Sequence, residues 1–126
     1  MEEGKTILLV DDDLTLREMY EERLKMEGFN IVQATNGEEA LQKAGEVKPS
    51  IILLDIMMPK VNGFDVLKSL KANAEMKDIP VIVLTALIQD VDRVQGKKLG
   101  AVDYIVKSET MPGEVIAKIK NALGQK

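Results

Sequence analysis

The chain has 126 residues, 45% of them hydrophobic, and a formal net charge of −4 at pH 7, which predicts a single domain over residues 1–126 with one core. It contains no cysteine and no histidine, so disulfides, thiolate metal sites and histidine acid–base catalysis are excluded. The acidic balance argues against direct contact with nucleic acid. No apolar stretch approaches the roughly 20 residues of a membrane helix, and the charged N-terminus lacks the pattern of a signal peptide. We therefore expect a soluble cytoplasmic domain without membrane insertion.

In the first half of the chain, two predicted strands alternate with two predicted helices. The apolar run Ile7–Val10 predicts a strand buried on both faces, as in parallel sheets, and Phe29–Ala34 is a second candidate. The first helix is indicated by apolar residues at the helical period of about 3.6 residues, namely Leu16, Met19, Tyr20 and Leu24. The second helix covers Glu38–Glu46, with Asn36 as its expected N-cap and Glu39 in the capping-box position.

The second half of the chain repeats this alternation. Strands are predicted at Ile51–Leu54, Val81–Leu84 and Ile105–Val106, and a helix at Gln89–Leu99. Two further helices are indicated by periodic apolar residues, namely Phe64, Leu67 and Leu70 for one and Val115, Ile116, Ile119 and Leu123 for the other. Strand and helix thus alternate five times. This predicts an α/β fold with a doubly wound open sheet of five parallel strands and five helices.

Polar side chains follow four of the predicted strands. They are the triplet Asp11–Asp13, then Asp55, Thr85 and Lys107, and ligands of such sheets bind beyond the carboxyl ends of the strands. Taken singly, an aspartate at a strand end is more often a turn former or a helix cap, which is the simpler interpretation of Asp13. Taken together, carboxylates without histidine or cysteine suit Mg²⁺. A carboxylate at such a metal can attack phosphorus, and a hydroxyl and an ammonium group can stabilise phosphoryl oxygens.

Four segments resemble the receiver domain of two-component response regulators, most closely its stand-alone chemotaxis type. They are Ile7–Asp13, Ile51–Gly63, Val81–Ala86 and Gly100–Lys107, and the resemblance extends over nearly the whole chain. It implies a flavodoxin-like fold with the strand order 2-1-3-4-5. Both a stand-alone relay and a fragment of a larger regulator stay open.

The resemblance also implies roles for the acidic residues. Asp55 would be the phosphoacceptor. Asp12 would bind Mg²⁺ directly and Asp11 mainly through water. Asp55 and the backbone carbonyl of Met57 would complete the protein ligands of the metal.

Three further residues take roles from the same resemblance. Thr85 and Lys107 would hold the phosphoryl group, and Tyr104 would be a switch aromatic that turns inward as Thr85 moves toward that group. This movement would remodel the surface of the fourth helix, fifth strand and fifth helix. One departure from the family pattern is Ser108, which replaces the usual proline after the lysine. A cis bond before a residue other than proline costs about 3 kcal/mol, so the Lys107–Ser108 bond is open to the trans form.

The expected phosphoryl donor is a sensor histidine kinase or a phosphotransfer protein, and the downstream protein target stays unknown. Enzymatic activity would be limited to self-phosphorylation and slow autodephosphorylation. We expect Met57 and Leu87, which are bulky and flank the site, to slow hydrolysis by screening water. Asp103, Tyr104 and Lys118 partly match the dimer face of transcription-factor receivers, so a monomer and a weak dimer through the fourth helix, fifth strand and fifth helix are both open.

Three other functions compete with this interpretation. The segment Asp11–Thr15 fits the Asp-x-Asp-x-Thr signature of haloacid-dehalogenase-like phosphatases, with Asp11 as nucleophile and Asp13 as general acid. The chain is short for that family, and no second acidic pair follows the fourth predicted strand. A pseudo-receiver that binds partners without phosphorylation is a further alternative. A flavin-binding domain is disfavoured, because three carboxylates after the first strand would repel a cofactor phosphate.

Overall fold

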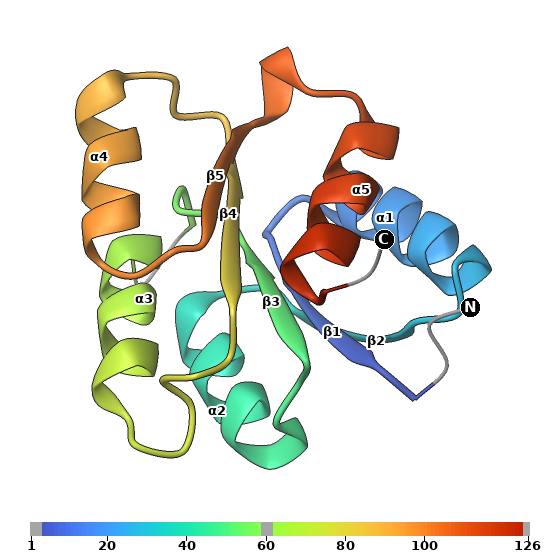
Figure 1. The fold of residues 1–126 in the computed structure, drawn as a ribbon, viewed down its shortest axis with the longest axis horizontal. Coiled ribbons are helices and arrows are strands. Elements are labelled where there is room, and N and C mark those ends of the chain that lie inside the picture. Colours follow the sequence, from blue (N-terminus) through green and yellow to red (C-terminus); the bar gives the residue numbers. More distant parts are fainter. Residues whose placement is uncertain (1–3, 59–61, 125–126) are drawn as a thin grey trace.

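The computed structural model describes residues 4–58 and 62–124, which form a parallel sheet between two layers of helices (Figure 1). The strands are β1 (Thr6–Val10), β2 (Asn30–Ala34), β3 (Ile51–Leu54), β4 (Val81–Thr85) and β5 (Asp103–Val106). All pair in parallel in the order β2-β1-β3-β4-β5. The predicted fold class and strand order are confirmed.

The helices cover both faces of this sheet. They are α1 (Leu14–Met26), α2 (Gly37–Val47), α3 (Gly63–Ala72), α4 (Asp90–Lys98) and α5 (Pro112–Ala122), with a short 3-10 turn, η1, at Lys107–Glu109. Helices α1 and α5 lie on one side of the sheet, and α2, α3 and α4 lie on the other (Figure 1). Among the described residues, no helix is both long and apolar enough to cross a membrane.

Each strand contributes side chains to two aliphatic cores, because successive residues of a strand point to opposite faces. In β1, Ile7 and Leu9 pack against α1 and α5, whereas Leu8 and Val10 pack toward α2 and α3. The central strands are buried along their whole length. This two-sided burial explains why their sequences are continuous apolar runs without polar alternation.

Four predicted strand boundaries were wrong. Strand β1 begins at Thr6 rather than Ile7, and β4 ends at Thr85 rather than Leu84. Strand β2 begins at Asn30 rather than Phe29, because the Phe29 amide donates to the carbonyl of Leu24 and closes the end of α1. Gly28 makes this turn with a φ of 95°, a conformation that favours glycine. At the other edge of the sheet, β5 begins at Asp103 rather than Ile105, because Asp103 and Tyr104 also pair with β4.

The starts of α1 and α2 follow local capping rules. Asn36 caps α2 and accepts a hydrogen bond from the Glu39 amide at 3.0 Å, as predicted. The Glu39 carboxylate accepts from the amide of Thr35, one residue before the cap. Asp13 caps α1 by accepting from the Leu16 amide at 3.2 Å. The simpler interpretation of Asp13 as a helix cap is therefore confirmed.

Candidate functional site

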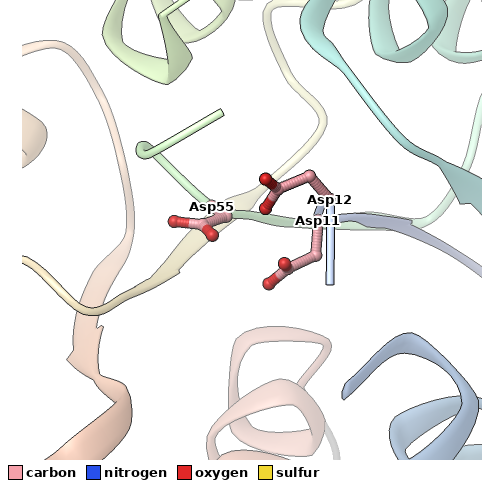
Figure 2. Close-up of side chains that lie close together, drawn as sticks. All are labelled: Asp11, Asp12 and Asp55. Atoms are coloured by element: carbon pink, nitrogen blue, oxygen red, sulfur yellow. The ribbon is translucent and has the colours of Figure 1, made fainter. Parts of the chain in front are cut away.

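Three carboxylates meet where β1 and β3 end (Figure 2). One oxygen each from Asp11, Asp12 and Asp55 lies within 4.8 Å of the others. Asp11 and Asp55 are 1% and 4% exposed, whereas Asp12 is exposed to solvent. Because β1 and β3 pair with Val10 beside Leu54, the residue that follows each strand is delivered to the same edge of the sheet. In Figure 2 the carboxylate of Asp12 is directed toward Asp55.

Lys107 joins two of these carboxylates from the end of β5. Its Nζ lies 2.8 Å from Oδ2 of Asp11 and 3.1 Å from Oδ2 of Asp55. Burial alone would lower the pKa of Lys107, but the hydrogen bond to Asp11 and the charge of Asp55 outweigh it, and the pKa is raised. Burial raises the pKa of Asp11 despite its contact with Lys107. Lys107 is therefore held as an ammonium ion within the acidic cluster.

The bond after Lys107 is trans, since the described residues contain no cis peptide bond. Lys107, Ser108 and Glu109 form the turn η1, which leads toward α5. The replacement of the family proline by Ser108 thus leaves Nζ of Lys107 in contact with Asp11 and Asp55.

The backbone after Asp55 is held tightly by α3. The Met57 amide donates to Oδ1 of Asp55 at 3.0 Å, and the Gly63 amide donates to the carbonyl of Ile56 at 3.0 Å. A Cβ atom at Gly63 would lie 2.4 Å from Cα of Ile56 and 2.6 Å from the carbonyl oxygen of Asp55. Only glycine allows this approach. Pro59, in the predicted phosphoacceptor segment, lies outside the described residues.

Thr85 and Tyr104 connect the site to the surface near α4. Thr85 is fully buried at the end of β4, and its Oγ1 accepts from the Leu87 amide at 3.4 Å. The Tyr104 hydroxyl donates to the Leu87 carbonyl at 3.1 Å. We expected the Tyr104 ring to turn inward during switching, but it already lies inward in this structure and is 3% exposed.

A cavity of about 400 Å³ opens beside the carboxylates. Its lining consists of Asp12, Ile56, Met57, Met58, Asn62 and Leu87. The Met57 residue is 52% exposed. Both bulky residues that sequence analysis singled out, Met57 and Leu87, therefore lie around the space next to Asp12.

The donor set of the cluster fits a divalent cation. When ionised, the carboxylates of Asp11, Asp12 and Asp55 carry three negative charges, and Lys107 neutralises one of them. Among the residues that the structure describes, two of the negative charges then have no ion-pair partner, at an edge where two of the carboxylates are buried. Oxygen ligands of this kind suit Mg²⁺, which usually takes one or two protein carboxylates and keeps several waters.

Comparison with known proteins decides the family. A family model described as the response regulator receiver domain matches residues 7–120. This chain belongs to that family.

One curated protein and two solved structures show what this receiver domain is similar to. The transcriptional regulatory protein CpxR homolog of Haemophilus influenzae is 45% identical over 117 residues, which are 93% of this chain and 49% of that protein. The BeF3-activated receiver domain of RstA from Klebsiella pneumoniae is 28% identical with a TM-score of 0.88, covering 96% of this chain and 100% of that chain. The chemotaxis protein CheY4 of Vibrio cholerae is 28% identical with a TM-score of 0.85, covering 93% and 97% of the two chains.

The receiver domain corresponds to one part of its curated relatives. The receiver domain spans about half the length of the curated relatives that it matches. The narrower prediction of a stand-alone chemotaxis type is not confirmed, because those relatives bear the names of transcriptional regulators. Membership in the receiver domain family itself was predicted correctly.

One residue beside the receiver site was missed in the sequence. Arg17 is buried on the inward side of α1, where the apolar pattern had indicated Leu16 and Met19 as core residues. Those two side chains are only partly buried. The available signal was the spacing of Arg17 to Tyr20 and Leu24, which places an arginine in the inward stripe of the helix.

Proposed function

We propose that this receiver domain accepts a phosphoryl group on the carboxylate of Asp55. The observation that carries the proposal is the contact of Asp55 with Lys107 at 3.1 Å, in a cluster with Asp11 and Asp12. A buried carboxylate that has both an ammonium group and a divalent-cation site beside it can react with an anionic phosphoryl donor without strong repulsion.

The metal would be held by carboxylate oxygens of Asp11, Asp12 and Asp55 and by the backbone carbonyl of Met57. Mg²⁺, when bound there, supplies positive charge to the phosphoryl oxygens. Of the two residues that follow β1, Asp12 would bind the metal directly and Asp11 mainly through water. Support for this assignment comes from the carboxylate oxygens, which lie within 4.8 Å of one another.

The expected reaction exchanges one bond to phosphorus for another. An oxygen of Asp55 attacks the phosphorus of a phosphohistidine, the bond from phosphorus to the histidine nitrogen breaks, and an aspartyl phosphate forms. Lys107 and the hydroxyl of Thr85 would donate hydrogen bonds to the transferred oxygens. In the later hydrolysis, water attacks phosphorus, and the bond to the Asp55 oxygen breaks to release phosphate.

The signal would then reach partners through α4, β5 and α5. The connection runs from Thr85 through Leu87 to Tyr104. The Leu87 amide donates a hydrogen bond to the Thr85 hydroxyl, and the Leu87 carbonyl accepts one from the Tyr104 hydroxyl. The donor would be a sensor histidine kinase or a phosphotransfer protein, and the readout would be binding of a protein target. A stand-alone chemotaxis-type relay and one domain of a transcriptional regulator are both compatible with this proposal, as are a monomer and a weak dimer through α4, β5 and α5.

Two wider expectations stay predictions. One is that residues 1–126 form a single receiver domain, which is supported by one sheet and its two helix layers over the described residues. The other is a cytoplasmic location.

The test is the intact mass of the protein after incubation with acetyl phosphate, with and without Mg²⁺. Wild type is expected to gain one phosphoryl group only when Mg²⁺ is present. Asp55→Asn should abolish the gain and Asp11→Asn should weaken it. The surface variant Asp65→Asn, on the exposed side of α3, is the matched control and should label like wild type.

The outcomes separate the competing functions. No labelling of wild type under any condition would favour a pseudo-receiver that binds partners without phosphorylation. Labelling that persists in Asp55→Asn but disappears in Asp11→Asn would favour the phosphatase alternative. That alternative has little support, because its general acid would be Asp13, which instead caps α1.

A further inference from the structure

Arg17 is the buried cation nearest in sequence to the acidic triplet. It lies in the first turns of α1 and is 7% exposed, on the inward side with Tyr20 and Leu24. A charged side chain is expensive to bury unless its donors are hydrogen-bonded. The hydrogen bonds of Arg17 should therefore explain why a buried position of α1 holds an arginine and not an apolar residue such as leucine.

The Arg17 guanidinium bridges the end of β1 and the edge strand β2. Its Nη1 donates to the backbone carbonyl of Asp11 at 2.7 Å, and its Nε donates to Oε1 of Gln33 at 2.9 Å. The Gln33 side chain is itself oriented by Glu21, one helical turn after Arg17, which accepts from Nε2 of Gln33. Gln33 of β2 thus helps to hold the guanidinium next to the peptide unit that contains the Asp11 carbonyl.

That peptide unit joins Asp11 to Asp12. Because a peptide is planar, fixing the Asp11 carbonyl also fixes the direction in which the chain enters Asp12. Within residues 4–58 and 62–124, no hydrogen bond or ion pair holds the Asp12 carboxylate. The direction of its Cα–Cβ bond, from which the carboxylate extends toward Asp55 in Figure 2, is set by this backbone.

We propose that Arg17 is a positioning residue for the metal site, and that its hydrogen bond to the Asp11 carbonyl sets the direction of the Asp12 carboxylate. The proposal rests on the proposed function, which places Mg²⁺ among Asp11, Asp12 and Asp55. Residues that orient metal ligands through one intermediate contact typically change metal affinity about 10- to 100-fold when they are removed.

The alternative roles of Arg17 predict different results. If Arg17 acted only through its charge, its removal would strengthen Mg²⁺ binding, because one cation near the site would disappear. If it only stabilised the contact of α1 with the sheet, its removal would lower thermal stability and leave Mg²⁺ affinity unchanged. Positioning alone predicts weaker Mg²⁺ binding despite the loss of a repelling charge.

The experiment is isothermal titration of Mg²⁺ into wild type, Arg17→Met, Gln33→Leu and the control Arg23→Met, with melting temperatures measured without metal. Arg23 lies on the same helix and is exposed, so its variant matches the change in charge and should bind like wild type. Arg17→Met should raise the dissociation constant about tenfold. Gln33→Leu should raise it less, because one of the two anchors of the guanidinium persists.

Equal or tighter Mg²⁺ binding in folded Arg17→Met would overturn the inference. If Arg17→Met does not fold, Gln33→Leu decides: weaker binding supports the inference, and unchanged binding overturns it. Wild type that binds no Mg²⁺ would instead overturn the metal site of the proposed function, and the inference with it. Failure of the inference alone is recognised by normal Mg²⁺ binding in wild type and both variants.

Discussion

A Cβ atom at Gly96 would lie 2.9 Å from Cδ2 of Tyr104. The absence of a side chain on α4 therefore makes the room that the inward tyrosine ring occupies. Two other contacts hold the ring there: its hydroxyl donates to the Leu87 carbonyl, and the Arg93 guanidinium carbon lies 5.6 Å from its centroid. The position of the proposed switch residue thus depends on a glycine in the helix that partners would contact.

Gly96→Ala should displace Tyr104 toward solvent. The protein has two tyrosines and no tryptophan, so Tyr104 is the only fluorophore in a Tyr20→Phe background. Acrylamide quenching of its fluorescence should increase in Gly96→Ala. The control is Gly113→Ala in α5, where a Cβ would meet nothing within 4 Å. Equal quenching in both variants would show that the ring keeps its place without Gly96.

Lys107→Met should tighten Mg²⁺ binding and slow phosphoryl labelling. The ammonium group occupies oxygens of Asp11 and Asp55, so its removal frees these ligands and removes a repelling charge. The same change deletes a donor to the phosphoryl group, which we expect to reduce the labelling rate by about 100-fold. Titration calorimetry and timed intact mass spectra measure the two effects. Lys118→Met, which breaks an exposed ion pair with Asp103, should change neither.

Replacing Met57 and Leu87 together with asparagine should shorten the life of the aspartyl phosphate. Both side chains line the cavity beside Asp12, where polar groups could bind and orient the attacking water. We expect hydrolysis to accelerate about tenfold, equivalent to ~1.4 kcal/mol in the barrier. Decay of the phosphorylated mass after removal of acetyl phosphate gives the rate. The exposed neighbour Ile88→Asn is the control, and an unchanged decay in the double variant would refute the screening hypothesis.

Gly63→Ala should destabilise the fold next to Asp55. The added methyl group would overlap backbone atoms of Ile56 and Asp55, which cannot rotate away as a side chain can. Overpacking of this kind costs about 1–3 kcal/mol, measurable as a lower free energy of unfolding in urea. Gly45→Ala in α2, where a Cβ meets nothing within 4 Å, should be neutral or stabilising by up to about 1 kcal/mol. Similar urea curves for the two variants would contradict this prediction.

The start of α2 should contribute an acid-sensitive part of the stability. The Thr35 amide, together with Lys43, lowers the pKa of Glu39 below its ordinary value of 4.5. A carboxyl whose pKa is lower in the folded state stabilises the fold above its unfolded pKa and loses this contribution as pH falls through the folded value. The difference in unfolding free energy between wild type and Glu39→Gln should therefore shrink below pH 4.5. A difference that stays constant down to acid unfolding would argue against it.

The polar ends of the strands could be predicted because they follow local patterns. Asp55 and Thr85 come directly at the ends of continuous apolar runs, and in a parallel sheet all such ends lie along one edge. The start of β5 was missed because it depends on pairing with another strand and not on a local pattern. Asp103 and Tyr104 are strand residues because they pair with Ile82 and Val83, and pairing partners cannot be identified from the periodicity of a single segment.

Arg17 shows why the inward side of a helix is hard to identify from hydrophobicity alone. By hydrophobicity, an arginine in a helix is expected to face solvent. The apolar residues Leu16 and Met19 were therefore predicted to face the core, and Arg17 was not. Burial of Arg17 becomes favourable only because Gln33 of β2 and the Asp11 carbonyl accept its hydrogen bonds. Neither acceptor is adjacent to Arg17 in the chain, so the compensation appears only in the folded protein.

The sequence by itself determined the parallel α/β sheet and the residues that follow its strands, since both depend on the local order of apolar and polar residues. Only the tertiary structure decided that Lys107 reaches both Asp11 and Asp55 and that Tyr104 already lies inward. These are contacts between segments far apart in the chain. Their distances depend on strand register and on the space that residues such as Gly96 leave open, and no periodicity within one segment encodes them.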